Sequence, residues 1–288
     1  GLPHASGYAD ALIVSPKANL VLSPTRSVDL FFNAGLGFHS NDARDVVITQ
    51  RIDNQARALR QQGLSDADIN AALAAQRFDP AQRGATVLPK AVGTEVGTRI
   101  RLLDQLTVGA AAWLLDLEEE FVYVGDAGTT EPSGRTRRVG VDVEACAQVL
   151  SWLTADADMT LSRGRLRDAP EGENVIPLAP TFTSTGGLTA QHPSGARASL
   201  RYRRINARPA NEDGSVTAQG YTVVDALGAY AFGRAEVILT VENLFDVAWN
   251  EAQFDTESRL PGEDAPVSEL HFTPGNPFNI RLGVSYQF

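Results

Sequence analysis

The chain contains 288 residues, of which 43% are hydrophobic and 21% are charged, so a disordered polymer is excluded. A formal net charge of -10 argues against nucleic acid as the main partner, because phosphate binding needs a surplus of Lys and Arg. The single cysteine, Cys146, excludes an intrachain disulfide framework and a cysteine-rich zinc site.

The sequence predicts no membrane-spanning helix. The longest apolar run lies around residues 110–115, whereas a spanning helix needs about 20 residues. Residues 1–4 do not combine a basic region with an apolar core, so we expect no signal peptide in this chain. The chain also begins without Met, and we interpret it as a fragment or a processed form.

The dominant hydrophobic pattern has a period of two. Between Phe278 and Phe288, for example, every second residue is apolar and the residues between them are polar or small. Successive side chains of a strand point to opposite faces, so each such segment has one apolar and one polar face. Many segments approach the roughly 9–11 residues that a tilted strand needs to cross a bilayer. The pattern predicts eleven strands, at residues 17–24, 27–40, 94–103, 106–124, 137–150, 153–166, 181–192, 195–206, 220–232, 234–247 and 278–288.

The connections between the predicted strands alternate between short and long. Each short connection contains only a few residues, around Pro24, Asp104, Ser151, Pro193 or Gly233. The long ones cover residues 41–93, 125–136, 167–180, 207–219 and 248–277. Outer-membrane barrels have this asymmetry, with tight periplasmic turns and long external loops. We therefore predict an all-β, antiparallel up-and-down transmembrane β-barrel, with a soluble all-β sandwich as the alternative.

The first long loop carries a predicted helical insert at residues 50–83. Residues 54–62 are expected to form one helix that ends at Gly63, because Gly readily terminates helices. Ser65 is a favourable cap for a second helix, which ends before Pro80. We interpret this insert as part of an external loop rather than as a separate domain.

Charged residues occupy the polar phase of several predicted strands. In a barrel they would line the lumen, where opposite charges on neighbouring strands pair and hold a plug through polar contacts. In a soluble sandwich the same residues would form the outer face. The apolar phase, predicted to face lipid, includes Leu30, Phe32, Val141, Leu161, Leu282 and Val284. The predicted lumen-facing residues are Arg99, Arg101, Asp142, Glu144, Asp156, Asp158, Arg201, Arg203, Glu236 and Glu242.

Other chemistry-bearing patterns favour structural roles. Residues 66–70 open like a calcium-binding loop, but Ala71 and Arg77 stand where that loop needs Gly and Glu. The acidic run at residues 116–120 is expected to be a solvated strand end rather than a catalytic carboxylate pair. The four His residues lack metal-ligand spacing, and no nucleophile or phosphate-binding motif is present. We predict no catalytic residue, no metal and no cofactor.

Three segments resemble those of TonB-dependent outer-membrane receptors. Residues 33–44, Asn-Ala-Gly-Leu-Gly-Phe-His-Ser-Asn-Asp-Ala-Arg, resemble a barrel strand and its loop entry. Residues 241–246, Val-Glu-Asn-Leu-Phe-Asp, resemble the penultimate strand. Residues 271–288 resemble the final strand with its terminal aromatic residue, Phe288. The resemblance covers nearly the whole chain, apart from the helical insert.

The resemblance implies a Gram-negative outer-membrane receptor, not an enzyme, with a barrel of about twenty-two strands around a plug. Such receptors import ferric siderophores, cobalamin or carbohydrates with energy passed by TonB. The implied partners are outer-membrane lipid, the plug, TonB, a small nutrient ligand and an assembly machinery that recognises Phe288. We interpret residues 1–288 as the carboxyl-terminal part of the barrel, without the plug or TonB box. The alternatives are a soluble all-β binding module, a glycan-processing enzyme and a non-functional receptor remnant.

Ligand contacts are expected from the external strand ends and the long loops, because the barrel wall faces lipid and lumen. The loop at residues 248–277 carries aromatic side chains beside charges, as ligand sites usually do. Alternatively, these aromatic residues form an interfacial girdle and pack the loop against itself. The predicted ligand-binding residues are Trp249, Phe254, His271, Phe272, His39, Asn41 and Arg44.

Overall fold

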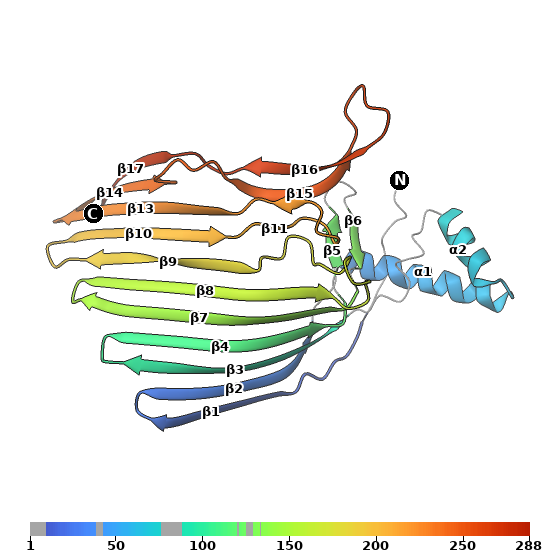
Figure 1. The fold of residues 1–288 in the computed structure, drawn as a ribbon, viewed down its shortest axis with the longest axis horizontal. Helices are drawn as coiled ribbons and strands as arrows, with labels where there is room; N and C mark the ends of the chain where they lie inside the picture. The colour runs from blue at the N-terminus through green and yellow to red at the C-terminus, as the bar shows by residue number, and fades with distance from the viewer. Residues whose placement is uncertain (1–9, 39–42, 76–87, 120, 125–128, 133) are drawn as a thin grey trace.

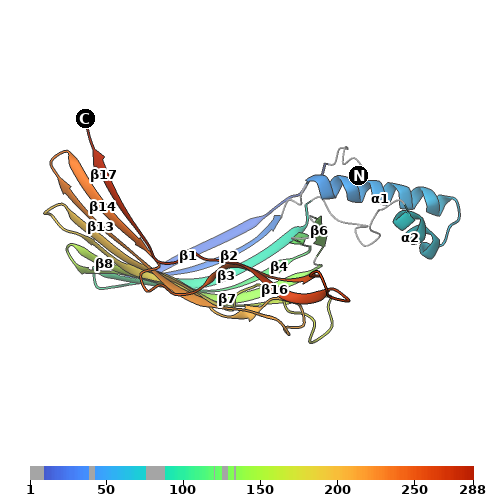
Figure 2. The same cartoon turned by 90° about the horizontal axis from the view of Figure 1, so that it is seen from above.

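The main element of the fold is one curved antiparallel sheet (Figures 1 and 2). The computed structural model describes residues 10–38, 43–75, 88–119, 121–124, 129–132 and 134–288. The sheet has eleven strands, and each strand pairs with its neighbours in sequence order apart from the small loop hairpins between them. Its strands are β1 (Lys17–Thr25), β2 (Val28–Phe38), β3 (Lys90–Leu102), β4 (Leu106–Leu117), β7 (Thr136–Leu150), β8 (Leu153–Leu166), β9 (Phe182–Gln191), β10 (Ala196–Ile205), β13 (Tyr221–Phe232), β14 (Ala235–Glu242) and β17 (Asn279–Tyr286).

The predicted number of strands and their antiparallel order are confirmed, but two strands end earlier than predicted. Strand β4 ends at Leu117 because both of its neighbours run out there: Leu117 pairs with Ala91 of β3 and with Thr136 of β7. Strand β14 ends at Glu242 because the next residue, Asn243, has a φ of 50° that turns the chain out of the strand. Alternating hydrophobicity cannot reveal where a neighbouring strand stops.

The loops and helices gather at one end of the sheet, and the short turns lie at the other (Figure 1). Three long connections contain small two-stranded sheets of their own. This arrangement confirms the alternation of short and long connections inferred from the sequence. The additional strands are β5 (Phe121–Val124) with β6 (Thr129–Pro132), β11 (Arg208–Pro209) with β12 (Thr217–Ala218), and β15 (Asn250–Ser258) with β16 (Val267–Pro274).

The first helix of the first long loop begins earlier in the chain than predicted. Helix α1 spans Ala43–Gln61 and helix α2 spans Asp66–Ala75. The predicted helix at residues 54–62 therefore begins at Ala43 instead. The early part of α1 contains a Val-Val-Ile-Thr run, whose β-branched residues lower helix propensity and hid this extension.

The contact between the two helices explains why α1 forms despite that weak propensity. Ile52 and Ala56, one helical turn apart on α1, pack with Ile69 and Leu73 of α2, and all four are at most 2% exposed. Tertiary packing of this kind commonly overrides intrinsic propensity. The small cluster is separate from the sheet and gives the insert its own core.

The caps of this helix pair agree with the prediction. Gly63 has a φ of 86°, and the amide of Leu64 donates to the carbonyl of Leu59 at 3.3 Å, which ends α1 in a Schellman motif. At the start of α2, the Asp68 amide donates to Ser65 Oγ at 3.3 Å. The predicted stop at Pro80 lies outside the described residues. Among the described residues, neither helix is long and apolar enough to cross a membrane.

Pair registers assign every sheet residue to one of two faces. We call the face containing Leu30 the apolar face and the face containing Asp29 the polar face. The six residues predicted to face lipid all lie on the apolar face and are between 42% and 71% exposed. Nothing in the sheet covers these large hydrophobic side chains, so the apolar face fits an apolar solvent rather than water.

The sheet does not close on itself. Its order runs from β1 at one edge to β17 at the other, without a pairing between them. Figure 2 shows the curvature of the sheet, and Figure 1 shows β1 and β17 at its opposite edges. Open edges carry unpaired backbone groups, which a bilayer does not tolerate. The eleven strands therefore fit a segment of a larger barrel.

Candidate functional site: the polar face and the loop end

The polar face carries six ion pairs between described residues, of which three join adjacent strands and three reach across an intervening strand. Arg201 Nη1 lies 2.5 Å from Asp156 Oδ1, and Arg203 Nη1 lies 2.6 Å from Asp225 Oδ2. Similar pairs join Arg99 to Glu144 at 3.4 Å, Arg101 to Asp29 at 3.1 Å, Arg281 to Glu242 at 2.9 Å, and Arg197 to Glu236. All ten residues predicted to line the lumen lie on this face.

These ion pairs keep the polar face hydrated rather than holding the sheet together. Their arginine side chains are between 41% and 66% exposed, so water screens the attraction. Exposed pairs of this kind contribute only about 0–1 kcal/mol each to stability. The face therefore offers a wet, charged surface, which suits contact with polar groups more than with a hydrophobic core.

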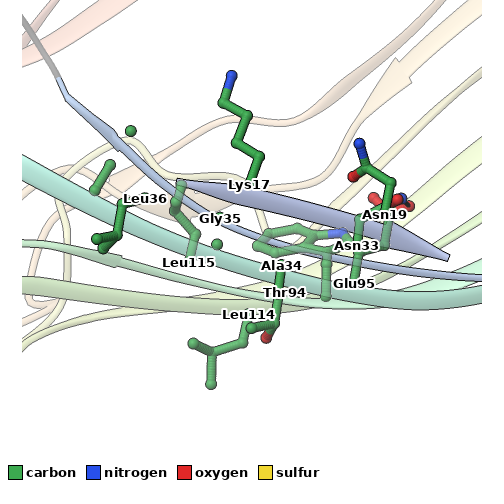
Figure 3. Close-up of a pocket in the computed structure, with 14 residues that line it drawn as sticks. Lys17, Asn19, Asn33, Ala34, Gly35, Leu36, Thr94, Glu95, Leu114 and Leu115 are labelled. Carbon is green, nitrogen blue, oxygen red and sulfur yellow. Dashed lines mark hydrogen bonds between the residues drawn. The ribbon is translucent and has the colours of Figure 1, made fainter. Parts of the chain in front are cut away.

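A hollow of about 410 Å³ opens over β1–β4. Lys17, Asn19, Asn33 and Glu95 line it with polar groups, and Figure 3 shows these side chains projecting from adjacent strands. Asn33 Nδ2 donates to Glu95 Oε1 at 3.1 Å. Gly35 leaves room beside Lys17, because a Cβ at this position would lie 3.1 Å from Lys17 Cγ. This hollow was not predicted from the sequence, although Gly and Asn on the polar phase of one strand were a usable signal.

Trp113 forms the aromatic part of the same hollow. A Cβ at Gly140 would lie only 2.4 Å from Trp113 Cζ2, so the indole packs directly against the backbone of β7. Gly140 therefore fixes the position of the ring, since any larger residue would displace it.

The loop between β14 and β17 is anchored by the Asn-Leu-Phe-Asp segment. Asn243 is 1% exposed, and its Nδ2 donates to the carbonyls of Val247 at 2.9 Å and Asn276 at 3.0 Å. Its Oδ1 accepts from the Val247 amide at 2.9 Å. Asp246 Oδ1 accepts from the Phe278 amide at 2.9 Å. The motif thus ties the start of the loop to its end, which is a structural role.

Trp249 sits at the base of this loop and is held from several sides. Its Nε1 donates to the Asn276 carbonyl at 3.1 Å, and its ring lies 4.8 Å from that of Tyr221. The Arg203 guanidinium lies 5.2 Å from the ring centroid. Trp249 thus contacts both its own loop and the sheet, which favours a structural role for this residue.

The hairpin of β15 and β16 separates the other predicted ligand residues. Phe254 and His271 are cross-strand partners and share one face. Phe272 pairs with Gln253 on the opposite face. Gln253 is 2% exposed and its side chain donates to and accepts from the backbone of Gln219, at 2.9 Å and 2.8 Å. The face of the hairpin that carries Phe254 and His271 therefore points away from the contact between Gln253 and Gln219.

The remaining predicted ligand residues belong to the first long loop. His39 and Asn41 lie outside the described residues. Arg44 lies in the first turn of α1, and only its backbone is described. Their proximity to the β15–β16 hairpin stays a prediction. In the described part of the chain, no three His, Cys, Asp or Glu side chains are grouped to hold a metal ion.

The external ends of β7 and β8 are joined by a bidentate pair just outside the strands. Arg135 Nε lies 3.0 Å from Asp168 Oδ1, and the Arg135 amide donates to Asp168 Oδ2 at 3.1 Å. The side-chain and backbone hydrogen bonds from Arg135 lower the pKa of Asp168 to about 2. The carboxylate therefore stays charged and keeps the two loop ends together.

Comparison with known proteins gives the family. The family described as TonB dependent receptor-like, beta-barrel, matches residues 5–244. The catecholate siderophore receptor Fiu of Escherichia coli (strain K12) is 25% identical over 289 residues, which cover 92% of this chain and 37% of that receptor. The chain thus spans little more than a third of the curated relatives that it matches.

Solved structures show the same fold. The closed form of Fiu from Escherichia coli K12 has a TM-score of 0.60 at 19% identity, covering 93% of this chain and 34% of that one. The unliganded ferric citrate transporter FecA has a TM-score of 0.63 at 16% identity, with coverages of 95% and 38%. The ferric yersiniabactin uptake receptor FyuA from Yersinia pestis has a TM-score of 0.60 at 15% identity, with coverages of 95% and 37%. The chain belongs to the TonB-dependent receptor family, and its open sheet is part of the β-barrel of that family.

Proposed function

We propose that this chain forms the carboxyl-terminal wall of an outer-membrane receptor that takes up a ferric siderophore with energy from TonB. The observation that carries the proposal is the division of one sheet into an uncovered apolar face and an ion-paired polar face, with all long loops at one end. The names of the relatives support ferric siderophores over cobalamin or carbohydrates as the nutrient. The relatives are receptors and transporters, which supports a role without catalysis.

Within this proposal, the two faces have different tasks. The apolar face contacts outer-membrane lipid, and the polar face lines the lumen, where its charged residues contact the plug. Because the ion pairs are solvated, the polar face can exchange internal pairs for contacts with the plug at little free-energy cost. Phe288 follows the last strand and is fully exposed, which fits its proposed role as an assembly signal.

The ligand is proposed to contact the Phe254–His271 face of the β15–β16 hairpin. Phe254 is 52% exposed, so its ring is free for stacking against a planar ligand. His271 is the cross-strand partner of Phe254, and its Nε2 lies 3.2 Å from Oγ of Ser258, a residue on the same face of the hairpin. Trp249 lies at the base of the loop, where its ring packs against that of Tyr221.

The test is uptake of radiolabelled iron by cells that express the full-length receptor, at limiting ferric siderophore. The double substitution Phe254→Ala and His271→Ala should lower uptake several-fold and leave receptor abundance and heat-modifiability unchanged. The matched control is Phe272→Ala, which removes an aromatic residue that is 59% exposed on the other face of the same hairpin.

Two results would contradict parts of the proposal. Uptake that is unchanged in the double variant would remove the Phe254–His271 face from the ligand site. Uptake by the unchanged receptor that persists in cells without TonB would contradict the energised transport itself.

A further inference from the structure

The apolar face carries six charged residues, and all of them lie at the loop end of the sheet. Every other outward position of the eleven strands is apolar, small or an uncharged polar residue. The end of the same face beside the short turns has no strand residue with a charge. The six residues are Lys90, Asp116, Arg137, Arg163, Arg165 and Arg204.

Three of the arginines are neighbours on adjacent strands. Arg137 of β7 is the direct cross-strand partner of Arg165 on β8, and Arg163 lies two residues further along β8 on the same face. Like charges placed directly opposite each other repel. An anion among the guanidinium groups, or full solvation of these groups, reduces this repulsion.

A fourth arginine extends the group across β9. The Arg204 guanidinium lies 5.9 Å from the ring centroid of Phe182, and Phe182 is the cross-strand partner of Leu161 on β8. Arg204 therefore leans from β10 toward the strand that carries Arg163. We call Arg137, Arg163, Arg165 and Arg204 the outer basic cluster.

Protein carboxylates neutralise only part of this cluster. Asp116 accepts both hydrogen bonds of a bidentate pair with Arg137, each at 2.7 Å. Within the described part of the chain, no carboxylate is paired with Arg163, Arg165 or Arg204. Arg163 and Arg204 are exposed on the side of the sheet that faces lipid. The guanidinium groups of the cluster thus lie on the face directed at the membrane rather than on the face directed at the lumen.

We propose that the outer basic cluster binds phosphate groups of a lipid in the outer leaflet. The cluster lies at the headgroup level, because it occupies the last residues of its strands at the end that carries the long loops. Guanidinium groups bind phosphate oxygens bidentately, and the surrounding apolar strands hold the acyl chains against Leu161 and Val139. The lipid phosphate supplies the negative charge that the neighbouring arginines lack.

The inference rests on the fold and the family, and it does not depend on which nutrient is transported. Its partner is a lipid because the guanidinium groups are on the outside of the wall, where no solute in transit through the lumen would meet them. Loss of uptake and loss of lipid binding are therefore separable results.

The test measures lipid binding by native mass spectrometry of the full-length receptor in a neutral detergent. The probes are phosphorylated lipid A and enzymatically dephosphorylated lipid A. The test variant is Arg163→Gln with Arg165→Gln. The matched control is Arg26→Gln with Arg234→Gln, which removes the same charge from exposed arginines in the short turns at the opposite end. Heat-modifiability confirms that both variants fold.

The expected result is that the receptor and the control prefer phosphorylated lipid A, and that the test variant binds it about tenfold more weakly or worse. Dephosphorylated lipid A should bind equally weakly to all three. Equal affinity of the test variant and the control for phosphorylated lipid A would overturn the proposal. Displacement of bound lipid by an equal concentration of inorganic phosphate would also overturn it, because the cluster would then be an anion site and not a lipid site.

Discussion

At the residue scale, Asn243 shows how a short motif acts through backbone geometry. Its φ of 50° is unfavourable for most residues but is tolerated by Asn and Gly. Its side chain makes three hydrogen bonds with backbone groups on both sides of the loop. The motif could be recognised from the sequence, whereas its partners Val247 and Asn276 could not, because they depend on how the loop returns.

Substituting Asn243 separates these two contributions. Asn243→Gly keeps the favourable φ but removes the hydrogen bonds, at a cost of about 1 kcal/mol for each bond. Asn243→Ala should cost roughly 1 kcal/mol more, because the positive φ becomes strained. The apparent unfolding temperature of the full-length receptor, measured by heat-modifiability, should fall in the order Asn, Gly, Ala. Equal unfolding temperatures of the Asn243→Gly and Asn243→Ala variants would show that the positive φ at this position does not affect stability.

The Arg135–Asp168 pair predicts a pH dependence at the loop end. The pKa of Asp168 is about 2, which lies below the value of about 3.9 for a free Asp, so folding is favoured while this carboxylate is charged. The stabilisation is present above about pH 3.9 and is lost as the pH falls through about 2. Its size is small, because the Asp168 side chain is 46% exposed.

Carboxyl ¹³C NMR of selectively labelled receptor measures this titration. Asp168 should titrate near pH 2 in the unchanged protein, and Arg135→Gln should raise its pKa toward about 3.9. A titration that is unaffected by Arg135→Gln would show that the carboxylate does not depend on that arginine.

At the element scale, the strands follow from the sequence while the loop elements do not. Period-two hydrophobicity predicts the eleven sheet strands because each strand has one apolar face and one polar face. The segment that forms the β15–β16 hairpin is predicted from the sequence only as a long loop, because it lies outside the main sheet. The early half of α1 was not predicted because its Val-Val-Ile-Thr run lowers helix propensity, and the packing of the later residues Ile52 and Ala56 against α2 depends on tertiary structure.

The candidate site was predictable only in part, for a related reason. The phase of each strand placed the charged residues on one face, but not their cross-strand pairing, which depends on register. The hollow over β1–β4 requires Lys17 and Asn33 to come together from adjacent strands. In the hairpin, the register puts Phe254 beside His271 and turns Phe272 to the other side.

Alternation along β17 makes a direct prediction about the environment of each face. Leu282 is 69% exposed on the apolar face, and Gly283 lies on the polar face. A spin label at position 282 should be accessible to oxygen in lipid, and a label at position 283 to a water-soluble relaxation agent. The exposed Cys146 is first replaced by Ser so that only the introduced cysteine is labelled. Similar environments at the two positions would contradict the assignment of faces.

At the scale of the whole molecule, the open sheet defines what the rest of the receptor must supply. The outer edges of β1 and β17 have unpaired backbone groups, and these need partners in a membrane. The relatives are much longer than this chain, which fits a barrel whose other strands come from further sequence. In the proposed receptor, the polar face with its solvated ion pairs lines part of the lumen.

Hydrogen–deuterium exchange of the full-length receptor in a bilayer tests closure of the wall most directly. Peptides that cover β1 and β17 should exchange as slowly as those from β7 and β8, because every strand in a closed barrel is paired on both sides. The outer residues of a sheet that stays open would instead lose their protection. Fast exchange confined to β1 and β17, with slow exchange in β7 and β8, would contradict the proposal that this chain is a segment of a larger barrel.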